Sequence, residues 1–218
     1  MIEAVIFDVD GTLVDSVGYH AEAWERAFAR FGKDVDKATL RARIGKGGDQ
    51  LMPEFLDDAE LHRIGDKLEK TRSEIFKDDY LHRLKGFPGC RALMQDLRKR
   101  GLKIALASSA KSSELKVYKE IADIDGLTDV ETSSDDAEKS KPHPDIFQAA
   151  LAKLKVAPSN AVVIGDSSFD AEAARKAGIP SIGVLCGGFS ESDLREAGAG
   201  RVYRDPADLL AHIGEWAA

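Results

Sequence analysis

The sequence contains only two cysteines, Cys90 and Cys186, and no apolar run approaches the roughly 20 residues that a membrane-spanning helix requires. The two cysteines lack the spacing of a zinc site, and they predict reduced thiols rather than a disulfide. The first apolar segment follows Met1 directly and leaves no room for a signal peptide. We therefore expect a cytoplasmic protein without a membrane partner.

The chain also lacks an excess of positive charge. Lysine and arginine number 31 against 38 aspartates and glutamates, which gives a formal net charge of -7. Because nucleic-acid binding needs clustered positive surface, we expect no nucleic-acid partner, and an anionic substrate would need a local positive pocket. The 218 residues, 43% of them hydrophobic, are enough for a substantial core and lie between one and two ordinary domains.

The most informative stretch lies near the N-terminus, where the apolar run at residues 4–7 ends in Asp8-Val9-Asp10-Gly11-Thr12. The run predicts a central strand of a parallel sheet, and open α/β sheets bind ligands at the carboxyl ends of their strands. Gly11 permits a turn that can bring both acids toward one pocket. An ordinary turn also explains Asp and Gly together. In the functional interpretation, one carboxylate acts as a nucleophile or binds a cation, and the other transfers protons.

Residues 17–81 carry helical spacing without a strand pattern. Helices are predicted over 19–31, 37–44, about 51–56 and 58–77, with a glycine-rich segment at 45–50. This block therefore reads as a helical unit inserted after the first strand. The predicted division is a core of residues 1–16 and 82–218 and an all-helical cap of residues 17–81.

From residue 87 onward, helices and strands alternate, which is typical of a parallel sheet with crossover helices. Ser108 and Asp166 each follow a predicted strand, as Asp8 does, so we expect the three side chains at one edge of the sheet. Neighbouring acids repel one another, and an all-oxygen set of Asp8, Asp166, a backbone carbonyl and waters suits Mg²⁺. Lys141 and Ser108 add hydrogen-bond donors, and the combined charge pattern fits a phosphoryl group.

These motifs together resemble the haloacid dehalogenase superfamily, in its subgroup of phosphatases with a C1-type helical cap, similar to phosphoglycolate phosphatase and β-phosphoglucomutase. The resemblance covers nearly the whole chain and implies a Rossmann-like parallel-sheet core. It is carried by the D-x-D-G-T motif from Asp8 to Thr12, the hydroxyl of Ser108, Lys141 before Pro142, and the G-D-x-x-x-D motif from Gly165 to Asp170. Each motif alone is weak, but four in this order are specific.

The resemblance also implies roles for single residues. Asp8 would attack phosphorus and form an aspartyl-phosphate, while Asp10 would protonate the leaving oxygen and then activate water. The phosphoryl oxygens would be held by Ser108, Ser109 and Lys141, with Thr12 orienting the Asp10 loop. Mg²⁺ would be bound by Asp8, Asp166 and the carbonyl of Asp10, and Asp170 would support Lys141 or the metal shell.

Three further site residues, His20, Lys46 and Gln50, are predicted in the cap. His20 would either approach the substrate, as a histidine does in related mutases and phosphatases, or make a hinge hydrogen bond. The segment 45–50 could be a simple helix–helix turn, but its place in the cap matches the loop that faces the active site in this family. We therefore predict that Lys46 or Gln50 contacts the leaving group.

The predicted function is a Mg²⁺-dependent phosphomonoester hydrolase that acts on a small phosphorylated metabolite. The main alternative is a sugar-phosphate mutase of the β-phosphoglucomutase type, although such enzymes typically carry Glu-Asp where this chain has Gly165-Asp166. A 2-haloacid dehalogenase would lack the second acid, Asp10, and a receiver-type signalling domain would carry its acids on different strands of a shorter chain. The substrate, whether phosphoglycolate, a sugar phosphate or a nucleotide, stays open, as does the choice between monomer and dimer.

Overall fold

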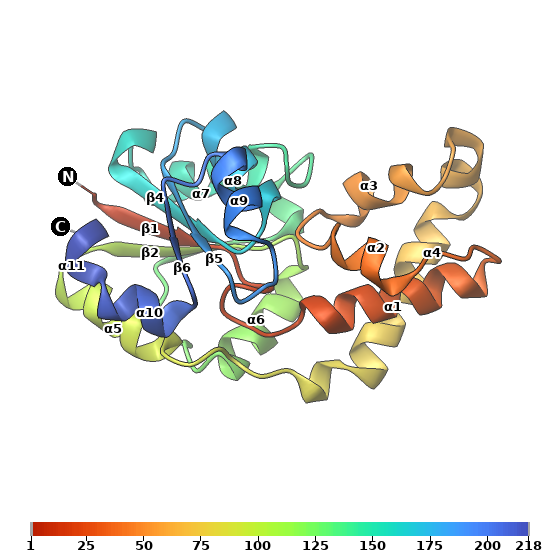
Figure 1. Cartoon of the computed structure of the whole chain (residues 1–218), viewed down its shortest axis with the longest axis horizontal. Coiled ribbons are helices and arrows are strands. Elements are labelled where there is room, and N and C mark those ends of the chain that lie inside the picture. The colour runs from red at the N-terminus through yellow and green to blue at the C-terminus, as the bar shows by residue number, and fades with distance from the viewer. Residues whose placement is uncertain (1, 218) are drawn as a thin grey trace.

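The protein is built on one six-stranded sheet in the order β3-β2-β1-β4-β5-β6, seen in the computed structural model, which describes residues 2–217 (Figure 1). All neighbouring strands are parallel. Their bounds are β1 (Ala4–Phe7), β2 (Lys103–Ala107), β3 (Val130–Thr132), β4 (Ala161–Gly165), β5 (Ser181–Val184) and β6 (Arg201–Tyr203). The predicted α/β fold class, a Rossmann-like core with an all-helical insertion, is therefore confirmed.

Helices connect the strands and also form one continuous block after β1. That block contains α1 (Val17–Arg30), α2 (Lys37–Arg41), α3 (Gly48–Leu51) and α4 (Asp58–Asp79). The remaining helices are α5 (Cys90–Lys99), α6 (Ser112–Ile121), α7 (Asp145–Leu154), α8 (Ser168–Lys176), α9 (Glu191–Ala197), α10 (Pro206–Ala211) and α11 (Ile213–Trp216). Within residues 2–217, no helix combines the length and apolar character needed to cross a membrane.

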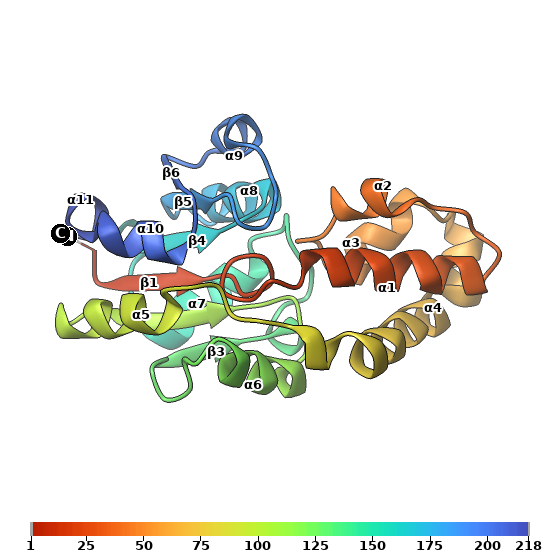
Figure 2. The same cartoon turned by 60° about the horizontal axis from the view of Figure 1, so that its bottom comes forward.

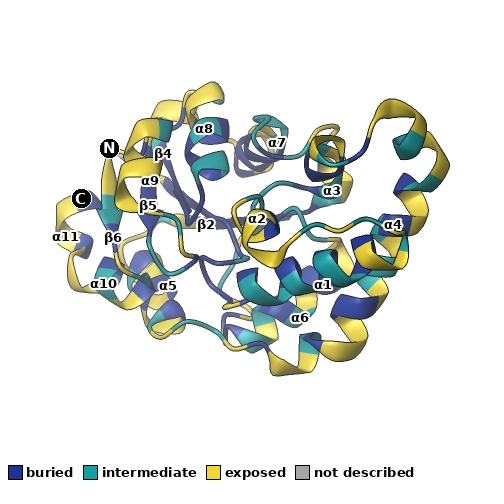
Figure 3. Ribbon diagram, turned by 45° about the vertical axis from the view of Figure 1, so that its right-hand side comes forward, coloured by how far each residue is buried: buried dark blue, intermediate teal, exposed yellow. Residues whose placement is uncertain are grey.

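Helices cover both faces of the sheet, and successive side chains of β1 point alternately to one face and to the other. Val5 and Phe7 belong to the apolar cluster that includes α5, whereas Ala4 and Ile6 belong to the cluster that includes α7 and α8. All four side chains are fully buried. Figure 3 shows the resulting pattern, with buried strands inside and exposed helix surfaces outside. An apolar run without polar alternation is what such a two-sided environment requires.

Strand order reverses at β1, which pairs with β2 on one side and β4 on the other. Phe7 is in register with Leu106 and with Ile164, so the chain segments that follow these three strands leave the sheet side by side. A ligand site is expected outside the carboxyl ends of the strands at such a reversal. The topology therefore places Asp8, Ser108 and Asp166 at one edge.

Helices α1 to α4 lie together beyond this edge of the sheet, and we call residues 17–81 the helical insertion (Figures 1 and 2). The chain enters and leaves it through an antiparallel bridge between Val14 and Gly86. α2 ends three residues before the predicted boundary. In place of one helix over 51–56, α3 is followed by a 3₁₀ turn, Met52–Glu54. Pro53 explains this turn, because it has no N–H to continue the helical hydrogen bonds.

We propose that the helical insertion is a domain of its own, and its tryptophan makes this testable. Trp24 lies in the insertion and Trp216 in the core, so each fluorophore reports on one unit. Phe28 is fully buried. The centre of its ring lies 5.7 Å from that of Trp24 and 5.4 Å from that of Phe55. Phe28→Ala should destabilise the insertion by about 3–5 kcal/mol.

The measurement is denaturant unfolding of Phe28→Ala in two single-tryptophan backgrounds, Trp216→Phe and Trp24→Phe. We expect the midpoint reported by Trp24 to fall further than the midpoint reported by Trp216. Phe28→Leu, which leaves a smaller cavity, should show the same order with smaller shifts. Equal shifts at both tryptophans would mean that the chain unfolds as one unit and would refute the two-domain division.

Candidate active site

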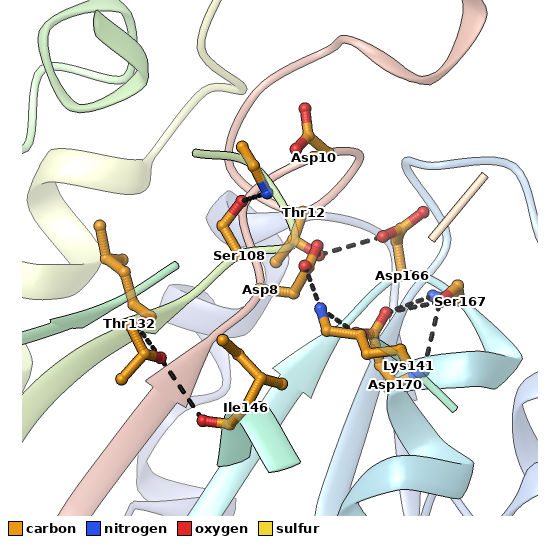
Figure 4. Close-up of polar contacts among 12 residues, drawn as sticks. Asp8, Asp10, Thr12, Ser108, Thr132, Lys141, Ile146, Asp166, Ser167 and Asp170 are labelled. Atoms are coloured by element: carbon orange, nitrogen blue, oxygen red, sulfur yellow. Dashed lines mark hydrogen bonds and ion pairs between the residues drawn. The ribbon is translucent and has the colours of Figure 1, made fainter. Parts of the chain in front are cut away.

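The centre of the site is a buried lysine between two aspartates (Figure 4). Lys141, 1% exposed, lies between β3 and α7, and its Nζ is 2.5 Å from Asp8 Oδ1 and 2.7 Å from Asp170 Oδ1. Burial by itself would lower the pKa of Lys141, but the charges of Asp170 and Asp8 outweigh it and raise this pKa. The ammonium therefore stays charged at the edge of the sheet.

Thr12 joins the first motif to the fourth. Its hydroxyl lies 3.0 Å from Asp8 Oδ2 and 3.2 Å from Asp166 Oδ1, and its single proton can be donated to either carboxylate. Gly11 makes this approach possible. Its φ is +83°, and a Cβ at this position would lie 2.6 Å from Asp166 Cγ. A residue with a side chain could not occupy this turn without displacing the acid.

The carboxylates of Asp8, Asp166 and Asp170 converge, each offering an oxygen within 4.8 Å of the others. Burial and the negative charge of Asp170 raise the pKa of Asp8 to about 7 against the opposing effect of Lys141. Burial and the charge of Asp8 also raise the pKa of Asp166. Three acids thus face one ammonium, and an all-oxygen donor set with surplus negative charge fits a hard divalent cation such as Mg²⁺. The residues present fit the predicted metal.

The Asp10 side chain does not belong to this carboxylate cluster. It points away from Asp8 (Figure 4), and its Oδ1 accepts a hydrogen bond from Ser16 Oγ at 2.6 Å and lies 2.9 Å from His20 Nε2. Burial raises the pKa of Asp10, but His20 and Ser16 outweigh it, and the net shift is downward. The two acids of the first motif thus have different environments. A metal contact through the Asp10 carbonyl stays a prediction.

The two serines follow β2, which pairs with one side of β1, whereas Asp166 follows β4, which pairs with the other side. Ser108 is fully buried, and its Oγ accepts a hydrogen bond from the N–H of Ala110 at 3.0 Å. Ser109 lines the open cleft. Both residues therefore lie where the sequence placed them, after the strand next to β1.

A cleft of about 750 Å³ separates the core from the helical insertion. The core contributes Asp8, Asp10 and Ser109 to its lining, and the insertion contributes residues from α1, α4 and the glycine-rich segment, among them His20, Trp24, Lys46, Arg72, Ser73 and Lys77. Both acids of the first motif thus open onto one cleft, although from different directions.

Lys46 and Gln50 differ in their positions. Lys46 lines the cleft, where its Nζ forms an ion pair with Glu54 and lies 4.8 Å from the ring centre of Phe169. Gln50 is not among the lining residues in the described part of the chain, and its amide donates to Asp49 Oδ2 at 2.9 Å. Contact of either residue with a leaving group stays a prediction.

Three residues near the site were not predicted from the sequence. Ser16 contacts Asp10, and Arg72 lines the cleft with its guanidinium 5.2 Å from the ring centre of Trp24. The third is Tyr118, whose hydroxyl lies 3.4 Å from His20 Nε2. Ser16 follows the first motif closely enough to be suspected. Arg72 and Tyr118 lie in ordinary amphipathic helices and carry no sequence signal.

Comparisons with known proteins agree with the fold and the motifs of this chain. Residues 5–184 match the model of the haloacid dehalogenase-like hydrolase family. The chain is 32% identical to a phosphorylated carbohydrates phosphatase of Thermotoga maritima, across 98% of this chain and 99% of that protein. It is 30% identical to a β-phosphoglucomutase of Bacillus subtilis, across 99% and 96%. The crystal structure of a hydrolase from Pseudomonas syringae superposes with a TM-score of 0.90 at 31% identity, covering 99% of both chains.

The surplus of buried acids predicts a pH-dependent response to Mg²⁺. The pKa of Asp8 rises on folding from 3.8 to about 7, so between these values the folded protein binds more protons than the unfolded chain. Without metal, the Asp8 contribution to stability should therefore fall as pH rises from 5 to 8. Mg²⁺ competes with these protons and should raise Tm more at pH 8 than at pH 5.

Differential scanning fluorimetry with Mg²⁺ or EDTA at both pH values measures this effect. Asp166→Asn should reduce the Mg²⁺-induced Tm gain, whereas Glu120→Gln, which removes an exposed acid, should leave it unchanged. A Tm gain that is the same at both pH values would contradict the proposed competition between protons and metal.

Proposed function

The chain belongs to the haloacid dehalogenase-like hydrolase family, and from this membership we propose that it is a Mg²⁺-dependent hydrolase of small phosphate monoesters. The observation that carries the proposal is the placement of Asp8. Its carboxylate faces the cleft beside the buried ammonium of Lys141, and a second acid, Asp10, enters the same cleft in a different environment. A nucleophile, a fixed cation and a separate proton carrier are what phosphoryl transfer through an enzyme carboxylate requires.

In the first half-reaction, an oxygen of Asp8 attacks phosphorus and the bond from phosphorus to the leaving oxygen breaks. The products are an aspartyl-phosphate and an alcohol, whose oxygen takes the proton carried by Asp10. Lys141, Ser108 and Ser109 bind the phosphoryl oxygens, and the ammonium offsets their negative charge. Thr12 holds Oδ2 of the Asp8 carboxylate and Lys141 holds Oδ1, so the orientation of the nucleophile is fixed.

In the second half-reaction, Asp10 takes a proton from water, and the oxygen of that water attacks phosphorus. The bond from phosphorus to Asp8 breaks, inorganic phosphate leaves, and both carboxyl groups return to their starting forms. The alcohol leaves from the side of phosphorus opposite Asp8, and the water later attacks from that same side. One carboxyl group on that side can therefore act first as acid and then as base. The position of Asp10, away from Asp8 and open to the cleft, supports this role.

Mg²⁺ would be held by Asp8 and Asp166, with the Asp10 carbonyl as the predicted third protein ligand, and when bound it supplies positive charge that neutralises the transferring phosphoryl group. Asp170, which converges on the same point, would hold Lys141 and support the metal shell. Gly11 keeps this arrangement possible by leaving room for the Asp166 carboxylate.

We propose that the helical insertion acts as a cap over the cleft and that it reads the leaving group. Its residues form one wall of the cleft, and water would be excluded when it closes on a substrate. Lys46 and Gln50 remain the predicted contacts. We also propose a cytoplasmic protein without nucleic-acid or membrane partners, which the free cysteines and the net negative charge support.

Replacement of the nucleophile tests the proposal most directly. Asp8→Asn keeps the shape of the side chain but removes the attacking oxyanion, so kcat/KM on any accepted phosphate ester should fall by roughly a thousandfold or more. Phosphate release from a panel of phosphorylated metabolites is the measurement. Asp15→Asn, the same change at an exposed site seven residues further on, should keep full activity. Substantial Mg²⁺-dependent turnover by Asp8→Asn would refute the proposal.

A sugar-phosphate mutase is the second candidate, because a β-phosphoglucomutase is 30% identical over nearly the whole chain. The two activities differ in what dephosphorylates the aspartyl-phosphate. Water does so in a hydrolase, and a sugar phosphate does so in a mutase. We expect steady release of inorganic phosphate from a single monophosphate substrate without an added sugar bisphosphate. Product analysis by ³¹P NMR distinguishes the two, and isomerised sugar phosphate as the main product would favour the mutase.

A further inference from the structure

Tyr118 ends in a polar atom that the proposed mechanism does not use. It lies on α6 of the core, its side chain is fully buried among the apolar residues of the main cluster, and its hydroxyl is 3.4 Å from His20 Nε2. Among residues 2–217 it is not part of the cleft lining, so it does not touch a substrate in the cleft. A buried phenol needs a hydrogen-bond partner to offset its desolvation, and both His20 Nε2 and the Asp10 carboxylate lie near enough to serve.

The imidazole of His20 is held on three sides. Its Nε2 faces Asp10 Oδ1 at 2.9 Å and the Tyr118 hydroxyl at 3.4 Å, and the ring stacks on Phe76 at 3.9 Å between centroids, with planes 7° apart. Stacking fixes the plane of the ring but leaves it free to rotate within that plane. Because the Asp10 carboxylate can only accept, Nε2 donates its proton to Oδ1, and the Tyr118 hydroxyl can donate its own proton to the same carboxylate. Burial and the charges of Asp10 and Glu114 raise the pKa of Tyr118, so its hydroxyl remains protonated.

The contact between Tyr118 and His20 joins the core to the helical insertion. Glu114, one turn earlier on α6, accepts a hydrogen bond from Ser73 Oγ at 3.4 Å and lies 3.1 Å from Lys77 Nζ, both on α4. The same face of α6 therefore binds α4 and approaches His20 on α1. Tyr118 reaches His20 only while the insertion sits in this position on the core.

We propose that Tyr118 is a positioning residue that, together with His20, holds Asp10 where the leaving oxygen is protonated. The inference rests on the proposed phosphatase function and deepens it. Removal of the hydroxyl takes away one of the groups that fix the Asp10 carboxylate and the neighbouring imidazole, and proton delivery to the leaving group becomes less efficient. Attack by Asp8 on phosphorus is unaffected, because its own contacts with Thr12 and Lys141 do not involve this network.

The experiment compares two leaving groups in Tyr118→Phe. An alkyl phosphate leaves as a strongly basic alkoxide that needs a proton, whereas 4-nitrophenyl phosphate leaves as a stable anion that does not. On both substrates, kcat/KM reports the steps up to aspartyl-phosphate formation, in which Asp10 acts only as an acid. We expect a loss of about tenfold on the alkyl phosphate and less than about threefold on the aryl phosphate. The change in selectivity is the signature, because a packing defect would slow both substrates.

Two further variants sharpen the result. Tyr203→Phe removes another phenol hydroxyl, which donates to Glu215 at 3.3 Å far from the site, and it should leave both substrates at wild-type rates. His20→Ala should show the same selective loss, and the double variant with Tyr118→Phe should lose less than the product of the two single losses, because both residues hold the same carboxylate. Equal losses on both substrates, unchanged kinetics, or additive losses in the double variant would each overturn the proposal. If Tyr118→Phe does not fold, Tyr118→Met provides the same comparison.

Failure of this inference and failure of the proposed function give different results. If the wild-type enzyme releases no phosphate from any monoester with Mg²⁺, the proposed function is wrong, and with it the inference. If the wild type hydrolyses both substrates and Tyr118→Phe keeps the wild-type selectivity, only the role of Tyr118 is wrong.

Discussion

The structure depends on one buried positive charge. A lysine with 1% exposure is tolerated only where opposite charges replace the water it has lost, and Lys141 finds these charges in Asp8 and Asp170. The ends of β1 and β4 and the segment before α7 must therefore meet at one point. The same constraint prepares the chemistry, because an ammonium held by buried carboxylates is already in place for an anionic group and needs no rearrangement when that group arrives.

Surplus negative charge is the complement of this interaction. One ammonium cannot balance Asp8, Asp166 and Asp170, and the raised pKa values of Asp8 and Asp166 express the remaining repulsion. A protein designed for stability alone would avoid such a cluster, since buried acids without enough partners cost free energy. The cost is understandable at a site that takes up a divalent cation, because the cation provides the missing charge. The proposed metal and the buried lysine would thus belong to one electrostatic arrangement.

The first motif separates two acids that are one residue apart. Asp8 turns into the carboxylate cluster, whereas Asp10 lies beyond it, between Ser16 and His20. The turn at Gly11 makes this divergence possible. The environments shift the two pKa values in opposite directions, up for Asp8 and down for Asp10. The proposed roles need the reverse order, which a bound Mg²⁺ beside Asp8 and the negative charge of a phosphate ester beside Asp10 would supply. Because Asp10 is held partly from α1, the position of the helical insertion bears on the proposed proton-transfer residue.

The sequence by itself determined the sheet, the helical block and the residues at the strand ends. Apolar runs that are followed by Asp8, Ser108 and Asp166 can pack as parallel strands only with these residues at the same edge, so spacing along the chain was sufficient. Lys141 was found because it stands before a proline in the order that the four motifs require. These features are local, or they follow from strand direction alone.

The tertiary structure decided which polar side chains meet in and around the cleft. The direction of the Asp10 carboxylate, the pairing of Lys46 with Glu54, the position of Gln50 outside the cleft lining of the described residues and the approach of Tyr118 to His20 carry no pattern in the sequence. Tyr118 and His20 are 98 residues apart along the chain and lie on helices whose spacing predicts only a buried face. Which polar atoms meet at such a boundary depends on how the helical insertion is set against the core, and hydrophobic periodicity does not encode that relation.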